Sequence, residues 1–237
     1  LKLLEKYQNK MKKKIVIACS KKWFFANIEV RKFLRKNKKN VFVILQKKKL
    51  NLKYLNKINP HIIFFPHWSF FVSEKIINKF KCISFHAAPL PYGRGGSPIQ
   101  NLIVRNFKKT PVCALQMTKT LDEGPIYLKK TIQLKGNLME ILDDMAEKIL
   151  QMMIKILNKK LKPRNQEGKI FLFRRFNPKN SELKKEKNIN KVYNKIRMLD
   201  SDEYPRSFIK LGRFKVYLSK VIKTKNSLSC EAKISLR

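Results

Sequence analysis

Residues 84–98 read SFHAAPLPYGRGGSP and join an apolar strand to the first turn of a helix. The apolar run at 82–85 leads into His86, a loop rich in proline and glycine follows, and the residues IQNLI at 99–103 continue as a helix. A histidine that ends a buried strand beside glycine-rich backbone places an ionisable ring and accessible amide groups at one point. We expect a ligand to bind there.

The rest of the chain alternates between short apolar runs and segments with helical spacing. A long helix from Asn137, with Glu140 in a capping box and an apolar stripe that reaches Ile156, would cover the strands. The alternation predicts an α/β fold with a doubly wound, mostly parallel sheet, which binds ligands at the carboxyl ends of its strands. We predict strands at residues 15–19, 41–45, 62–65, 82–85 and 112–117, and one further strand from the apolar runs at 126–128 and 131–134. Helices are predicted at 24–36, 52–58, 73–80 and 98–106.

Composition divides the chain into four stretches. Residues 1–11 are interpreted as an upstream extension, because Met11 and the lysines after it resemble a natural start, and residues 12–160 form the main domain. Residues 161–190 are more polar and predict a linker with a short strand at 170–173. Residues 191–237 predict a small β-rich subdomain, with a short helix at 191–200 and strands at 208–209, 214–218 and 232–234.

The charge of the chain is strongly positive. Lysine and arginine number 55 against 16 acidic residues, which gives +39 at pH 7. Such a field favours a nucleic-acid partner or another anionic partner. The lysines are nevertheless spread along the whole chain, as AT-rich coding would also produce, so the charge by itself leaves both interpretations open.

The four cysteines fit a cytoplasmic protein with reduced thiols. Cys19, Cys82, Cys113 and Cys230 form no C-x-x-C pair, and no histidine lies at ligand spacing from them, so we expect neither a disulfide framework nor a metal site. No apolar run approaches the roughly 20 residues of a membrane span, and no basic and apolar leader is present. We expect no membrane partner.

His86 and Asp122 are the candidate catalytic pair. Each follows a predicted strand and precedes or lies within a loop with glycine and proline. Histidine can donate or accept a proton near neutral pH, and a carboxylate beside it would orient the ring. An aspartate before glycine is also a common turn residue, so spacing alone leaves both roles open.

The motifs around these two residues resemble the formyltetrahydrofolate-dependent formyltransferase superfamily. The resemblance rests on His86 followed by the Leu-Pro, Tyr, Arg-Gly and Pro series at 90–98, and on Leu-Asp-Glu-Gly at 121–124. It extends to the tail, in residues 196–205, and covers most of residues 12–237. The sequence of residues 65–69 and 93–102 is most similar to that of bacterial formyltransferases that act on amino sugars, and less similar to that of methionyl-tRNA formyltransferase. The resemblance implies a Rossmann-type fold.

For the site, the resemblance implies that the formyl donor is 10-formyltetrahydrofolate. His86 would donate a proton to the tetrahedral intermediate or stabilise it, and Asp122 would help to remove the proton of the attacking amine. Tyr92, Arg94 and Gly96 border the cleft and would contact the acceptor. The segments implied to contact the folate contain Trp68, Ser69, Phe70, Ala88, Pro89, Leu90, Pro91, Thr118, Lys119, Thr120, Leu121 and Asp122.

One residue departs from the family pattern. The family usually has an asparagine two residues before the catalytic histidine, where its amide polarises the formyl oxygen, and this chain has Ser84. A hydroxyl is a shorter donor, so Ser84 substitutes through a water molecule or only packs. Loss of one oxyanion donor costs on the order of 10²-fold in rate.

We therefore expect a formyltransferase whose acceptor is the amine of a nucleotide-linked amino sugar, as in glycan biosynthesis, with a homodimer as a possible assembly. The alternatives are methionyl-tRNA as the acceptor, hydrolysis of the formylated folate, and a weakened homologue that only binds folate or sugar. The charge favours tRNA, whereas the short C-terminal region disfavours it. Nucleic acid is expected as a partner only if tRNA is the acceptor.

Overall fold

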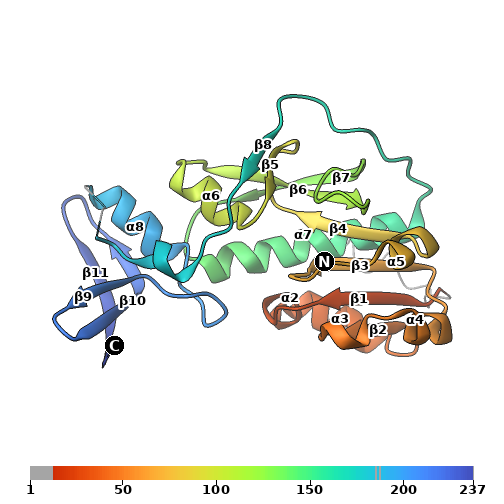
Figure 1. Cartoon of the computed structure of the whole chain (residues 1–237), viewed down its shortest axis with the longest axis horizontal. Coiled ribbons are helices and arrows are strands. Elements are labelled where there is room, and N and C mark those ends of the chain that lie inside the picture. Colours follow the sequence, from red (N-terminus) through yellow and green to blue (C-terminus); the bar gives the residue numbers. More distant parts are fainter. Residues whose placement is uncertain (1–12, 185, 187, 237) are drawn as a thin grey trace.

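The computed structural model describes residues 13–184, 186 and 188–236, so the predicted extension at 1–11 lies outside the described residues. A six-stranded sheet in the order β2-β1-β3-β4-β6-β7 forms the centre of the main domain (Figure 1). β1 to β4 pair in parallel, whereas β6 is antiparallel to both β4 and β7. The predicted α/β sheet is confirmed. Its strands are β1 (Ile15–Cys19), β2 (Val41–Ile44), β3 (Ile62–His67), β4 (Cys82–His86), β6 (Lys109–Gln116) and β7 (Ile126–Gln133).

Helices cover both faces of this sheet and create two cores. Because successive strand side chains point to opposite faces, β1 contributes Ile15 and Ile17 to one core and Val16 and Ala18 to the other. The first core is closed by α2 (Trp23–Ala26), α3 (Ile28–Lys36) and α7 (Leu138–Asn158), and the second by α4 (Leu52–Ile58) and α5 (Glu74–Lys79), with a 3-10 turn at Lys47–Lys49 before α4.

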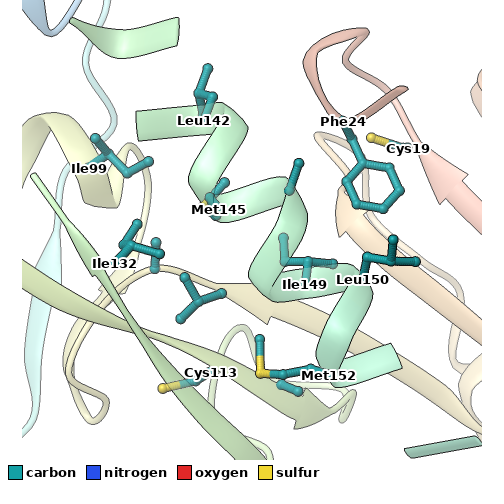
Figure 2. Packing of buried hydrophobic residues seen from close by; sticks show 14 of the residues in the cluster. Cys19, Phe24, Ile99, Cys113, Ile132, Leu142, Met145, Ile149, Leu150 and Met152 are labelled. Carbon is teal, nitrogen blue, oxygen red and sulfur yellow. The ribbon is translucent and has the colours of Figure 1, made fainter. Parts of the chain in front are cut away.

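The long helix α7 is the main support of the first core, as its apolar stripe predicts. Its start has the predicted capping box, in which the Asn137 and Glu140 side chains each accept a bond from the other's backbone N–H at 3.0 Å. Figure 2 shows Met152 beside the strand residue Cys113, and Leu150 beside Phe24 of α2. The helix therefore ties the antiparallel side of the sheet to the parallel side.

The predicted helix at 24–36 is wrong in one respect, because it divides into α2 and α3 at Asn27. The Asn27 backbone is extended, and its side-chain oxygen accepts hydrogen bonds from the N–H groups of Glu29 and Val30 at 3.0 and 3.1 Å. Asparagine is among the preferred N-cap residues, so this side chain starts a new helix rather than continuing the first.

A second difference lies after β4, where residues 92–95 were expected to be a loop. They form strand β5 (Tyr92–Gly95), which pairs in parallel with β8 (Phe171–Phe173), the short strand predicted within the linker region. Gly95 has φ +103°, and a Cβ there would lie 2.6 Å from the backbone oxygen of Phe173. Only glycine fits where the backbones of β5 and β8 approach each other this closely. The helix α6 (Pro98–Val104) follows as predicted.

The C-terminal part forms its own small sheet, at the left of Figure 1, with the strand order β11-β10-β9. A 3-10 turn at Pro178–Ser181 and α8 (Ile189–Arg197) precede β9 (Phe208–Leu211), β10 (Phe214–Lys223) and β11 (Leu228–Leu236). This antiparallel sheet confirms the predicted β-rich end of the chain, with longer strands than expected. Among the described residues, no helix has the length and apolar character needed to cross a membrane.

Three of the four cysteines are buried free thiols, as predicted. Burial raises the pKa of Cys19 and Cys82 to about 12 and that of Cys113 to about 11, so these thiols stay protonated at neutral pH. Cys230 on β11 is free and exposed. The described residues contain no group of three or more histidine, cysteine or acidic side chains arranged to hold a metal ion.

Candidate active site

His86 is the last residue of β4, and its ring is held between two oxygen atoms. Nε2 lies 2.7 Å from the backbone oxygen of Gly93, and Nδ1 lies 3.4 Å from Oδ2 of Asp122. A carbonyl oxygen can only accept, so Nε2 carries the proton in this contact. The side chain is 8% exposed. The ring is thus fixed in a largely dry position with a carboxylate on its inner nitrogen.

Asp122 reaches this position through loop geometry rather than through its strand. β6 runs antiparallel to β4 and ends at Gln116 opposite Ile83, so the carboxyl end of β6 does not lie beside His86. The loop after β6 returns to the histidine, with Asp122 in the left-handed region at φ +55°. Aspartate tolerates this conformation better than most residues. Asp122 therefore follows β6 as the sequence predicts, but the loop, and not the end of the strand, brings it to His86.

The close approach of this loop to its own strand depends on Gly124. A Cβ at that position would lie 1.7 Å from the backbone oxygen of Gln116, so no other residue fits without moving the loop. The Asp122 carboxylate is then fixed from the other side, because Oδ2 accepts a hydrogen bond from the Gly95 N–H at 3.0 Å. Strand β5 and the Asp122 loop therefore hold each other in place.

Gln166, which the sequence interpretation missed, locks the same loop. Its Nε2 donates to the backbone oxygens of Asp122 and Gly124 at 2.7 and 2.9 Å. Its Oε1 accepts from Nε and Nη2 of Arg94 at 3.1 and 3.0 Å. Gln166 lies in the stretch that was expected to be a linker and belongs to no motif, so no local signal marks it. Only the fold brings it to the site.

Arg94 was predicted to border the cleft and contact the acceptor. The structure places its guanidinium in contact with Gln166 and with Glu123, where Nη1 lies 2.8 Å from Oε1. The side chain is 9% exposed. The contacts of Arg94 in the structure therefore support the 122–124 loop.

Tyr92 and Gly96, the other two predicted acceptor contacts, lie against the β8 segment. The Tyr92 ring stacks on Phe171 with centroids 4.9 Å apart and meets Phe173 edge-on at 5.5 Å. The Gly96 N–H donates to the Phe173 oxygen at 3.1 Å, and a Cβ on Gly96 would lie 2.6 Å from that of Arg175. In the structure, Tyr92 and Gly96 hold the β5 segment against the β8 segment.

Ser84 projects from the same face of β4 as His86, because the two are separated by one residue. Its side chain is half-buried, and its hydroxyl has no hydrogen-bond partner within the described part of the chain. A hydroxyl that is not used by the fold, on the face that also carries His86, is available to a ligand.

The predicted folate segment after β3 presents aromatic surface. Trp68 packs edge-on against Phe70 with centroids 5.4 Å apart, and its Nε1 is buried without a hydrogen-bond partner among the described residues. Ser69 is instead tied to the end of β1, since its N–H and its hydroxyl both lie 3.1 Å from Oγ of Ser20. Phe70 is 42% exposed.

The other predicted folate residues divide into buried and exposed groups. Ala88, Leu90 and Pro91 are buried, Pro89 is half-buried, and the Leu90–Pro91 peptide bond is cis. Thr118 closes its loop by donating from Oγ1 to the Thr120 oxygen at 3.0 Å, whereas Lys119, Thr120 and Leu121 are exposed. The first group is thus largely enclosed by the fold, whereas Lys119, Thr120 and Leu121 are open to solvent.

A second cluster lies at the carboxyl ends of β1 and β3, beside this surface. The His67 ring meets Trp23 edge-on at 6.1 Å. Burial, together with the smaller effect of the charges of Lys21 and Arg175, lowers the pKa of His67 to about 4. His67 is therefore neutral at physiological pH.

Two family profiles match the chain. The formyl transferase profile matches residues 25–161, and a profile described as the C-terminal domain of methionyl-tRNA formyltransferase matches residues 178–235. Among curated proteins, the methionyl-tRNA formyltransferase of Thermotoga maritima is 32% identical over 189 residues, which cover 72% of this chain and 57% of that protein. The chain spans 36% to 59% of the length of the first curated relatives that it matches.

Solved structures agree on the fold. The methionyl-tRNA formyltransferase from Clostridium thermocellum superposes with a TM-score of 0.90 at 35% identity and covers 95% of this chain and 100% of its own. More remote structures share the fold alone: HypX from Aquifex aeolicus with tetrahydrofolic acid (TM-score 0.72, 16% identity, 89% of this chain and 38% of its own) and a 4-N formyltransferase from Francisella tularensis (0.61, 17%, 87% and 96%). The chain belongs to the formyl transferase family.

Proposed function

We propose that the protein transfers a formyl group from 10-formyltetrahydrofolate to an amine. The observation that carries this proposal is the His86–Asp122 pair, whose Nδ1 and Oδ2 atoms lie 3.4 Å apart in a largely dry position. The Ser84 hydroxyl, on the same face of β4 as His86, has no hydrogen-bond partner among the described residues. Family membership supports the same reaction.

In this reaction the amine attacks the formyl carbon and the formyl oxygen gains negative charge. A pre-aimed donor in a partly dry site stabilises such an oxyanion far better than water does. The Nε2–H group of His86 is that donor. In the structure Nε2 lies 2.7 Å from the Gly93 oxygen, so this hydrogen bond must break before the group can donate to the substrate. The Asp122 carboxylate keeps the ring oriented and accepts the proton that the amine loses.

We propose methionyl-tRNA as the acceptor. The match of residues 178–235 to the C-terminal domain of methionyl-tRNA formyltransferase supports this choice, as does the charge of +39, which favours association with a polyanion. An amino sugar as the acceptor, expected from the sequence of the motifs, remains a prediction. It is the alternative outcome of the same experiment.

The test follows release of tetrahydrofolate from 10-formyltetrahydrofolate in parallel reactions with no acceptor, with methionyl-tRNA, and with nucleotide-linked amino sugars. Release only with methionyl-tRNA, with one formyl group found on the methionine amine, is the expected result. Release only with a sugar would replace the tRNA proposal, and release without any acceptor would identify a hydrolase. Folate binding without release under every condition would show a binding protein and overturn the transfer reaction itself.

A further inference from the structure

Strand β11 (Leu228–Leu236) leaves one side of the C-terminal sheet open. It lies at the end of the order β11-β10-β9, and within the described residues no strand pairs with its outer side. Six consecutive residues, 229–234, are exposed. A long unpaired edge strand exposes a row of backbone donors and acceptors that can pair with another strand.

The alternate residues that point their backbone groups outward can be identified. The N–H of Leu218 in β10 donates to the Ser207 oxygen on the β9 side at 2.8 Å. The N–H and C=O of one strand residue point to the same side, so both groups of Leu218 face β9. Leu218 stands opposite Ala232 of β11, and that pair therefore exchanges no hydrogen bonds. Ala232 directs its own N–H and C=O to the open edge, as do residues two and four positions away.

The sequence of β11, LSCEAKISL, is complementary to itself in the antiparallel direction. If two copies meet with Ala232 opposite Ala232, each Glu231 stands opposite Lys233. The other opposing pairs are Leu228 with Leu236, Ser229 with Ser235, and Cys230 with Ile234. Apolar residues thus meet apolar residues or a thiol, hydroxyls meet hydroxyls, and charges meet their opposites.

We propose that β11 pairs with β11 of a second copy of this chain, antiparallel and with Ala232 on the twofold axis. The two C-terminal sheets then form one six-stranded sheet with an isologous interface. A second copy places a Lys233 opposite each Glu231, at two positions related by the twofold axis. An unrelated sequence would not be expected to provide opposite charges at both positions.

The charged groups at this edge are free to make the pairing. Lys233 forms no salt bridge among the described residues, and Glu231 contacts Lys220 of its own chain at 2.8 Å while remaining 62% exposed. A second carboxylate oxygen therefore remains for Lys233 of the other copy. Ile234 and Leu236, 63% and 65% exposed, would each gain an apolar or thiol neighbour across the interface.

The first test measures the dissociation constant of the full chain by sedimentation equilibrium. The substitution Lys233→Glu places two pairs of like charges across the interface and should raise the dissociation constant about tenfold or more. The double variant Glu231→Lys with Lys233→Glu restores opposite charges and should restore the dimer. Ala232→Pro removes an outward N–H without touching the β10 ladder and should give a monomer. Unchanged circular dichroism and melting temperature show that each variant folds.

The second test fixes the register through the native Cys230. In the proposed pairing Cys230 lies opposite Ile234 of the other copy, at the Cα separation of about 5.5 Å of a hydrogen-bonded antiparallel pair, which a disulfide can bridge. Ile234→Cys should therefore give a disulfide-linked dimer under mild oxidation. The same substitution together with Cys230→Ser should not, and neither should the native chain. A monomeric native chain, a dimer indifferent to both charge substitutions, or a cross-link in the Cys230→Ser control would overturn the proposal.

Discussion

The Asp122 carboxylate lies 3.4 Å from Nδ1 of His86, although His86 ends β4 and Asp122 lies in the loop after β6, a strand that runs antiparallel to β4. Oδ2 of Asp122 also accepts the Gly95 N–H at 3.0 Å, so strand β5 takes part in holding the pair. The geometry of the His86–Asp122 pair therefore depends on three separate segments. Substitutions in any of them should lower turnover, but for different reasons.

Replacing either member of the pair should abolish turnover without unfolding the protein. His86→Ala removes the proton donor, and Asp122→Ala leaves the ring without its carboxylate; each should lower kcat by at least about 10²-fold. The measurement is tetrahydrofolate release at saturating donor and acceptor. Asp144→Ala on the surface of α7, where Asp144 forms a salt bridge with Lys148 at 3.3 Å, is the matched control and should keep full rate. Near-full activity of either site variant would refute the assignment.

Ser84 should act as an oxyanion donor. Its hydroxyl is unused by the fold and shares a face of β4 with His86, so Ser84→Ala should lower kcat by about tenfold or more while leaving the KM for the folate nearly unchanged. Ser84→Asn, which restores the residue usual in the family, should equal or exceed the native rate. If Ser84→Ala keeps the native kcat, the hydroxyl only packs.

Gln166 should behave as a positioning residue. Gln166→Glu keeps the size and the acceptor for Arg94 but removes the two bonds that Nε2 donates to the 122–124 loop at 2.7 and 2.9 Å. We expect kcat to fall about tenfold, since loss of loop position misplaces the Asp122 carboxylate. Hydrogen exchange should increase at residues 122–124 in this variant. Glu167→Gln, the exposed neighbour, is the control and should change neither quantity. A loss of activity without faster exchange would mean a different role.

The sequence predicts the sheet and the two helix layers, and it singles out His86 and Asp122, which the structure brings together, because hydrophobic periodicity and short motifs are local signals. It does not predict how the pair meets. The direction of β6 depends on pairing with β4 and β7, which leaves no mark on β6 itself. The same holds for Gln166 and for the β5–β8 crossing, where the closeness of Phe173 explains Gly95 only after the fold is known. Asn27 was different: its capping role is a local signal that the helical spacing around it concealed.

Acid should destabilise the protein through His67. Its pKa is lowered by burial to about 4 in the folded state, whereas the unfolded chain has the ordinary value near 6.5, so the unfolded state binds more protons between these values. The free energy of unfolding should therefore fall as pH falls from about 6.5 to 4. Solvent reaches part of the half-buried ring, so we expect a loss of about 2 kcal/mol rather than the full linkage value.

The measurement is urea unfolding at several pH values between 7.5 and 4.5. His67→Gln removes the titrating group and should flatten the pH dependence. His61→Gln is the matched control: partial burial lowers the pKa of His61 too, but that side chain is exposed and should contribute little. If the free energy of unfolding changes with pH equally in the native chain and in His67→Gln, other groups cause the acid sensitivity.

Glu203 should fasten the C-terminal part of the chain to the start of α2. Its two carboxylate oxygens accept the N–H groups of Lys22 and Trp23, each at 2.8 Å, at the start of α2. Its own backbone oxygen accepts from Nζ of Lys21 at 2.6 Å. Hydrogen bonds to a charged group contribute about 2 kcal/mol, so Glu203→Ala should lower the free energy of unfolding by roughly that amount.

The neighbouring Asp202→Ala provides the control for this last variant. Asp202 is a carboxylate that is 94% exposed and pairs with Arg206 at 2.8 Å, so its loss should cost less than about 0.5 kcal/mol. Because the Glu203 bonds cap particular amides, hydrogen exchange of Lys22 and Trp23 should quicken in Glu203→Ala and stay unchanged in Asp202→Ala. Equal destabilisation by the two substitutions, without a local change in exchange, would mean that the C-terminal segment is held by its apolar packing and not by this carboxylate.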